Sequence, residues 1–122
     1  MTIGGRTMRS TSLTRGDVVL VPFPYSELTT TKARPALIIS TPTFLTEERR
    51  LTVAGITSNV GAHVNRTSYV LPDWEGVGLR KPSVVTSWLC SIAPRIVLHR
   101  IGALGDADMR QVEARLQVAL GV

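Results

Sequence analysis

The chain has 122 residues, of which 43% are hydrophobic, and this fits one folded domain and excludes intrinsic disorder. Lysine and arginine together number 14 against 9 acidic residues, for a net charge of +5, and all of them except Lys32 and Lys81 are arginines. That balance favours a polyanionic partner such as nucleic acid, and a simple solubility charge accounts for it equally well.

Other features exclude a disulfide-built or membrane-spanning protein. The single cysteine, Cys90, cannot form an internal disulfide, and no run of about 18 apolar residues is present to form a transmembrane helix. Residues 1–14 are small and polar, without the apolar run of a secretory signal. We therefore expect a flexible tail over 1–14, one domain over 15–122, no membrane association and a cytoplasmic location.

Short apolar runs rich in β-branched residues predict strands in the first half of the chain. The first run covers residues 17–22, and a polar, threonine-rich loop over 23–32 separates it from a second run at 35–40. Residues 41–50 form an irregular or short helical connector. A third strand is predicted over 51–57, where it ends in hydroxyl and amide side chains.

Strands continue in the second half, which indicates a mainly β protein. A fourth is predicted over 67–71 and a fifth over 83–88, with a turn-rich segment between them at 72–82. Residues 95–100 are either a sixth strand or part of a short helix. Strands first and a helix last argue against a repeated βαβ unit, and they favour a small, mainly antiparallel barrel with helical additions.

The last segment carries the clearest helix pattern. Asp106 is predicted as the N-cap and Gly121 as the stop signal. Apolar side chains recur with helical spacing between them, at Met109, Val112, Leu116 and then Ala119 or Leu120. This helix is expected to pack on the sheet and to have no catalytic role.

Several short motifs follow one another in a specific order and spacing. RGDVVLVPF at 15–23 and RPALIIS at 34–40 enclose the polar loop, and an apolar strand ends in the Ile-Thr-Ser of 56–58. GVGLR at 76–80 and SVV at 83–85 complete the set. Each motif is weak alone, but together they span nearly the whole chain. In this arrangement the sequence resembles the PemK/MazF family of toxin endoribonucleases.

The resemblance implies a fold, an activity and partners. The fold is a compact, SH3-like antiparallel β-barrel with a C-terminal helix, of the type shared by PemK, MazF and CcdB proteins, and it forms a homodimer. The activity is cleavage of single-stranded RNA at short sequence motifs, without a metal or other cofactor. A cognate antitoxin is implied as the partner whose tail covers the RNA groove.

The family's functional positions transfer only in part. Arg34, before the strand proline, and Thr57, at the end of the third strand, match catalytic positions, and Ser58 matches an RNA-binding one. Many members then carry an arginine and an aspartate just after the Ser-Val-Val strand, and in some these are assigned acid and base roles. Here that stretch holds the uncharged Thr86 and Trp88. The histidine that some members have in the first loop is also missing.

RNA cleavage without a metal requires the 2′-hydroxyl to attack the adjacent phosphorus. Arg34 suits the charge that develops on the phosphoryl oxygens, because charge-assisted hydrogen bonds are about twice as strong as neutral ones. Thr57 suits donation to a non-bridging oxygen if the strand end presents it to solvent. A surface ion pair for Arg34 and an ordinary strand position for Thr57 are the alternatives.

Basic, hydroxyl-bearing and aromatic side chains elsewhere are candidate RNA contacts. Thr31 and Lys32 lie at the far end of the polar loop and Tyr25 at its start, while Arg80 and Lys81 form a basic pair before the fifth strand. Aromatic rings hold unpaired bases by stacking, and cations pair with phosphates. Solvated loops and turns are often composed in the same way.

The two histidines complete the inventory of titratable candidates. His63 lies in a loop where it has the chemistry of a base near neutral pH, and His99 is interpreted as structural. Neither has the spacing of a metal ligand, so no metal site is predicted.

Three functions remain open on this sequence. The first is an RNA-cleaving toxin, and the second is a member that binds RNA or antitoxin without cleaving. The third is a gyrase-directed toxin of the CcdB type, although residues 117–122 lack the tryptophan that such toxins carry at the C-terminus.

Overall fold

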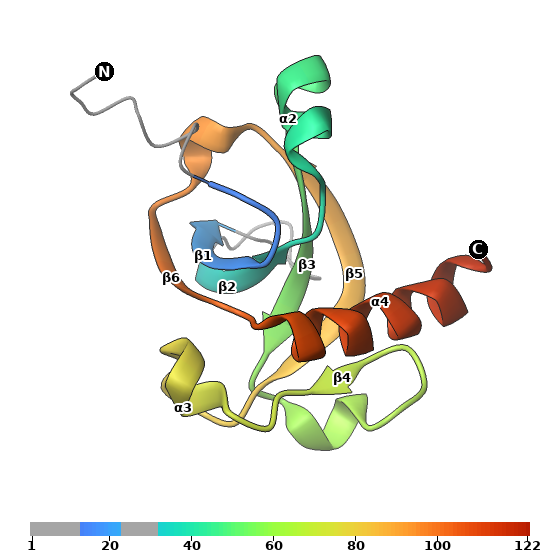
Figure 1. The fold of residues 1–122 in the computed structure, drawn as a ribbon. Helices are drawn as coiled ribbons and strands as arrows, with labels where there is room; N and C mark the ends of the chain where they lie inside the picture. The colour runs from blue at the N-terminus through green and yellow to red at the C-terminus, as the bar shows by residue number, and fades with distance from the viewer. Residues whose placement is uncertain (1–12, 23–31) are drawn as a thin grey trace.

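A computed structural model describes residues 13–22 and 32–122 of the chain (Figure 1). Its elements, in chain order, are β1 (Asp17–Pro22), β2 (Ala33–Ile38), α2 (Pro42–Glu48), β3 (Leu51–Thr57), a 3₁₀ turn (Val60–His63), β4 (Tyr69–Val70), α3 (Trp74–Val77), β5 (Val84–Ile92), a second 3₁₀ turn (Pro94–Ile96), β6 (His99–Ala103) and α4 (Asp106–Leu120).

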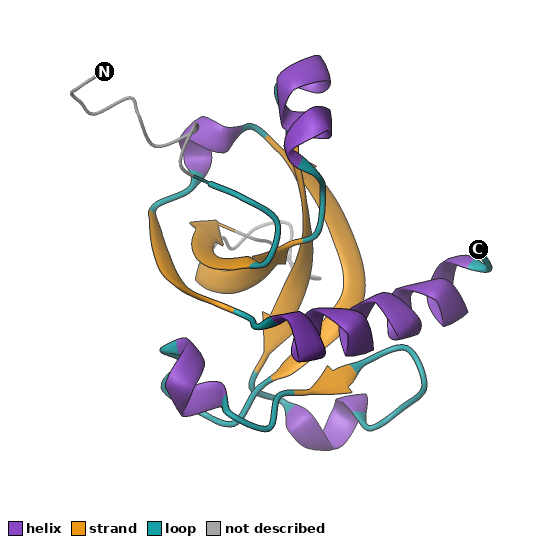
Figure 2. Ribbon diagram, viewed as in Figure 1, coloured by secondary structure: helices purple, strands orange, loops and turns teal. Residues whose placement is uncertain are grey.

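The strands form one sheet in the order β4-β5-β3-β2-β1-β6, and all of its pairings are antiparallel. Figure 2 shows that the sheet curls into a half-barrel and that α4 lies across it. The predicted architecture, mainly antiparallel β with a C-terminal helix, is thereby confirmed. No helix within 13–22 and 32–122 combines the length and the apolar character needed to cross a bilayer.

β5 is longer than the sequence indicates, because it pairs with β3 along that strand's entire length, from Leu51 opposite Ile92 onward. The register shifts between Ala54 and Ile56, which marks a bulge. At this bulge the buried Thr86 hydroxyl donates to the carbonyl of Gly55 at 2.8 Å. The prediction of a strand only over 83–88 therefore misses the last residues of β5, of which Ile92 is buried again.

Other boundaries shift by a few residues. β4 covers only Tyr69–Val70, and the ambiguous segment 95–100 divides into the second 3₁₀ turn and the start of β6. Pro94 occupies the first position of that turn, where its missing N–H costs nothing. Residues 41–50 contain α2, which is capped by the Thr41 side chain.

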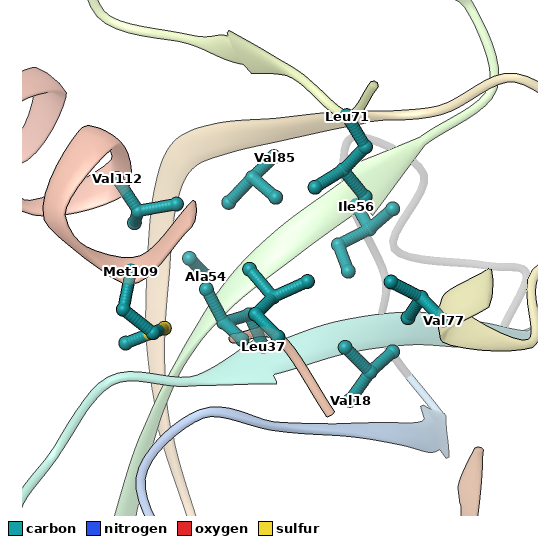
Figure 3. Close-up of a cluster of buried hydrophobic side chains, with 10 residues drawn as sticks. Val18, Leu37, Ala54, Ile56, Leu71, Val77, Val85, Met109 and Val112 are labelled. Carbon is teal, nitrogen blue, oxygen red and sulfur yellow. The ribbon is translucent and has the colours of Figure 1, made fainter. Parts of the chain in front are cut away.

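Side chains of β1 alternate between two hydrophobic clusters, one on each face of the sheet. Val19 and Val21 join the first cluster, to which Leu13 also belongs. Val18 joins the second, together with Leu37 of β2 and other buried side chains (Figure 3). Because both faces of β1 are covered, the strand is fixed in position and in register.

α4 covers the second cluster with the first part of its apolar stripe. Met109 and Val112 are buried and point toward the sheet (Figure 3), and Leu116 is half-buried. Leu120 is 56% exposed, so the stripe leaves the sheet near the helix end. Gly121 ends the helix in the left-handed region at φ 74°.

The start of α4 differs from the prediction. Gly105 is the N-cap, without a side-chain hydrogen bond, and Asp106 is the first helical residue. Asp106 and Asp108 still stand in the first turn, where negative charge complements the helix dipole. A salt bridge of 2.8 Å between Arg15 and Glu113 ties the middle of the helix to the beginning of the domain.

Candidate functional site

Arg34 lies near the start of β2 and Thr57 at the end of β3. In the register of these strands Ala36 lies opposite Gly55. Continuing that register by two residues places Arg34 opposite Thr57. Both residues are half-buried, so neither is enclosed in the hydrophobic core and neither is fully exposed to solvent. The two residues that the sequence selects as catalytic are therefore neighbours on adjacent strands.

A pocket of about 620 Å³ lies at this end of the sheet. Its lining includes a row of cross-strand partners, because Leu20 of β1 pairs with Pro35 on one side and with His99 on the other. Ile56 continues the row on β3. Directly paired residues of antiparallel strands share a face, so this row forms one wall. The volume is in the range that proteins use to bind small ligands and cofactors.

Five of the predicted site residues line this pocket: Arg34, Thr57, Ser58, Arg80 and Lys81. They come from β2, β3 and the turn after α3, which are far apart in the sequence. The structure thus brings together the predicted phosphate contact, the predicted hydroxyl and the basic pair.

The structure does not place the other three predicted contacts in the pocket. Lys32 is exposed just before β2 and is not part of the pocket lining. Thr31 and Tyr25 lie outside the described residues.

The Thr57 hydroxyl is oriented by a local turn. Its Oγ1 accepts a hydrogen bond of 3.1 Å from the backbone N–H of Asn59. A hydroxyl donates and accepts at once, so this bond uses an acceptor site and leaves the hydroxyl proton for another partner. The neighbouring Ser58 is exposed at the pocket. The end of β3 therefore offers two hydroxyl groups to the pocket, next to the apolar Ile56.

The basic turn is held in place by Ser83, whose hydroxyl donates to the carbonyl of Lys81 at 2.8 Å. The turn is also supported by the close packing of α3, which precedes it, against β6. A Cβ atom at Gly102 would overlap the carbonyl oxygen of Val77, and Gly78 adopts a positive φ of 106° close to Ile101. Only glycine allows the two backbones to approach so closely.

Sequence reasoning missed two members of the pocket lining, His99 and Arg100. The Arg100 Nε donates to Oδ1 of the buried Asp17 at 3.0 Å, and the backbone N–H of Thr14 donates to Oδ2 at 2.9 Å. Asp17 belongs to the RGD motif, but its partner is 83 residues away. No local pattern reveals such a pairing, and the isolated His-Arg pair carries no motif.

Thr86 and Trp88 are not part of the pocket lining. Thr86 is buried at the β3–β5 bulge, where its hydroxyl also accepts from the N–H of Trp88 at 3.1 Å. Trp88 is 45% exposed, and its ring packs edge-on against His63, with 4.8 Å between ring centroids. Both side chains therefore contribute to strand pairing and surface packing.

No ligand set for a metal is present in the part of the chain that the structure describes: no three histidine, cysteine, aspartate or glutamate residues come together there. The charged groups of the described lining are instead cationic, namely Arg34, Arg80, Lys81 and Arg100. Such a lining has the chemistry to bind phosphate or carboxylate groups.

Comparison with known proteins identifies one family. Residues 14–120 match the family described as PemK-like, MazF-like toxin of type II toxin–antitoxin system. No curated protein matches the sequence significantly.

Solved structures of similar fold come from several bacteria. The Mycobacterium tuberculosis toxin MazF-mt6 superposes with a TM-score of 0.70 at 23% identity, covering 87% of this chain and 97% of that one. MazF from Deinococcus radiodurans gives 0.71 at 20%, covering 90% and 97%. An endoribonuclease in complex with its cognate antitoxin, from a mycobacterial species, gives 0.72 at 18%, covering 91% and 97%. At these identities the likeness establishes the fold.

Proposed function

Because the chain belongs to the PemK-like, MazF-like toxin family of type II toxin–antitoxin systems, we propose that it is an endoribonuclease that cuts single-stranded RNA at short sequence motifs without a metal. The observation that carries this proposal is that Arg34 and Thr57, on neighbouring strands, share one cationic pocket. A solved structure of similar fold is itself described as an endoribonuclease.

The chemistry follows from the charge that develops during cleavage. When the 2′-oxygen attacks the phosphorus, negative charge accumulates on the non-bridging oxygens. The Arg34 guanidinium stabilises that charge through charge-assisted hydrogen bonds. The Thr57 hydroxyl donates a hydrogen bond to one of the same oxygens. Donors fixed on adjacent strands need little rearrangement as the charge appears, and such preorganisation is a major source of catalysis.

RNA binding is assigned to the cations around these two residues. Arg80 and Lys81 form one side of the pocket and contact the phosphates that flank the scissile one, with Ser58 beside them. Lys32, exposed just before β2, is assigned as a further phosphate contact, and Thr31 and Tyr25, outside the described residues, are kept as RNA contacts on the sequence alone. Since each phosphate contact releases counterions, binding weakens steeply as salt is raised.

The partners proposed are a cognate antitoxin and a second copy of the chain. A solved relative of similar fold is held in complex with its cognate antitoxin. A cationic pocket that accepts phosphates also accepts the carboxylates of an acidic antitoxin segment. Inhibition therefore follows from competition between that segment and RNA for the same groups.

The test incubates purified protein with a long single-stranded RNA in EDTA and maps the cut ends. We expect cuts at a recurring short motif, lost in the Arg34→Ala variant. Arg50→Ala is the matched control, because Arg50 is exposed and bonded to Ser91 outside the pocket. RNA that stays intact at micromolar wild-type protein would count against the activity.

A second candidate function is RNA or antitoxin binding without cleavage. Thr86 and Trp88 favour it, because these uncharged residues replace a pair to which acid and base roles are assigned in some relatives. This candidate predicts salt-dependent RNA binding with no cut ends. The cleavage assay therefore decides between the two.

A further inference from the structure

We propose that His99 is the group that accepts the 2′-hydroxyl proton during RNA cleavage, an assignment that rests on the endoribonuclease activity proposed above. His99 begins β6 and lines the same pocket as Arg34 and Thr57. It occupies a strand position remote from Thr86 and Trp88. The pocket thus gains a proton acceptor from a different part of the fold.

The register of the sheet fixes where His99 stands. Leu20 of β1 lies between Pro35 of β2 and His99 of β6, and all three line the pocket. Neighbouring strands are about 4.8 Å apart, so the backbones at Pro35 and His99 are separated by about two such spacings. Arg34 pairs with Val21, the neighbour of Leu20, so its side chain leaves β2 on the other face of the sheet. Both Arg34 and His99 nevertheless line the pocket, so a guanidinium and an imidazole that enter it from different sides can contact one ribose–phosphate unit.

The backbone around His99 is held on both sides. The N–H of Leu98 donates to the carbonyl of Leu20 at 2.8 Å, and Arg100 is bonded to the buried Asp17. These contacts fix the start of β6 against β1. The His99 side chain is itself exposed, so it meets solvent and ligand rather than the core.

His99 differs from the charged side chains of the pocket in its ability to exchange a proton. Arg34 comes from β2, Arg80 and Lys81 from the turn after α3, and Arg100 from β6 itself with Asp17 of β1 as its partner. Arginine and lysine side chains keep their proton through neutral pH. Among the described lining residues, His99 alone has a side chain of the type that exchanges a proton near neutral pH.

The proposed step balances with water as the only co-reactant. Neutral His99 imidazole takes the proton of the 2′-hydroxyl while the 2′-oxygen forms a bond to phosphorus. The bond from phosphorus to the 5′-oxygen breaks, and the leaving oxygen takes a proton from water. The products are a 2′,3′-cyclic phosphate and a 5′-hydroxyl. The imidazolium then returns its proton to the hydroxide left in solvent.

The experiment compares single-turnover cleavage of one RNA in EDTA, across pH, by wild type, His99→Gln and His63→Gln. The chain has only two histidines, and His63 packs on Trp88 outside the pocket lining, so His63→Gln is the matched control. Positioned proton transfer contributes about 10²–10⁴-fold, and we expect a loss of at least about 100-fold in His99→Gln only. Wild type should lose rate toward acid pH as the imidazole is protonated, and His99→Gln should not.

A second measurement separates proton transfer from a structural effect. Added imidazole should restore cleavage to His99→Ala and leave the His63→Ala rate unchanged. An unchanged rate in His99→Gln, or a loss of rate toward acid pH that persists in that variant, would overturn the assignment while leaving the endoribonuclease intact. Wild-type protein that cuts no RNA at any pH would overturn the parent activity, and this assignment with it.

Discussion

Asp17 accepts a hydrogen bond from the Nε of Arg100 at 3.0 Å, although the two residues are 83 positions apart in the chain. The carboxylate side chain is only 4% exposed and that of Arg100 is 52% exposed. One partner is therefore anchored in the domain, and the other extends to the edge of the pocket. The pair connects the start of β1 with β6 and so couples the stability of the fold to the shape of the site.

Removing the buried carboxylate should destabilise the protein. Asp17→Ala deletes the partner of Arg100 and the acceptor of the Thr14 N–H, and hydrogen bonds to charged groups contribute about 1.5–3 kcal/mol each. We expect the free energy of unfolding in urea to fall by about 2 kcal/mol. Glu47→Ala, on the exposed face of α2, is the control and should change it by less than about 0.5 kcal/mol. Equal effects of the two variants would contradict the role given to Asp17.

Thr86 is predicted to stabilise the bulge where β5 pairs with β3. Thr86→Val keeps the side-chain shape but removes the donor to the carbonyl of Gly55, which leaves a buried acceptor without its partner at a cost of about 1–3 kcal/mol. Urea unfolding should show this loss, whereas Thr43→Val on the exposed surface of α2 should be close to neutral. A Thr86→Val variant as stable as wild type would show that the hydroxyl is not needed there.

The glycine in β6 is predicted to be irreplaceable. Gly102→Ala places a methyl group on the carbonyl of Val77, so α3 must move away from β6 and take the basic turn with it. We expect a loss of at least about 2 kcal/mol in unfolding free energy, together with weaker RNA binding. Gly61→Ala is the matched control, because a Cβ there meets nothing within 4 Å. Similar melting temperatures for the two variants would refute the close approach.

The Tyr69 hydroxyl should make stability depend on pH in the alkaline range. Burial, and then the 2.6 Å hydrogen bond to Asp108, raise the pKa of Tyr69 to about 12. Because the folded pKa exceeds the unfolded value near 10, the contribution is complete below pH 10 and is lost as pH rises toward 12. Tyr69→Phe should cost about 1 kcal/mol at pH 8, and the difference from wild type should shrink above pH 10. A constant difference up to pH 12 would contradict this coupling.

Much of the fold can be predicted from local patterns. The apolar runs of β1, β2 and β3 fall within a few residues of the observed strands, since most of their apolar side chains are buried on both faces of the sheet, and β1 and β3 are rich in β-branched residues. β4 has only two paired residues, and its pairing depends on β5 rather than on its own composition. The exposed end of β5 is likewise set by the length of β3.

Some residues of the candidate site can likewise be identified from the sequence, and others cannot. Arg34 and Thr57 can be selected from the sequence because they match positions of the family that the motifs resemble, and the continued register of β2 and β3 places them opposite each other. Arg100 cannot, because its position depends on a carboxylate 83 residues earlier. His99 reaches the pocket only through its pairing with Leu20. Such relationships arise from the closure of the sheet, which no local window contains.

The central claim is that Arg34 and Thr57 act on one phosphate, and a double-mutant cycle tests it most directly. Single-turnover cleavage of one RNA in EDTA would be measured for wild type, Arg34→Ala, Thr57→Val and the double variant. Groups that act as a unit are not additive, so each single variant should lose at least about 100-fold and the double variant little more. Uncut RNA with wild-type protein, or losses in the two single variants that simply multiply in the double variant, would contradict the account.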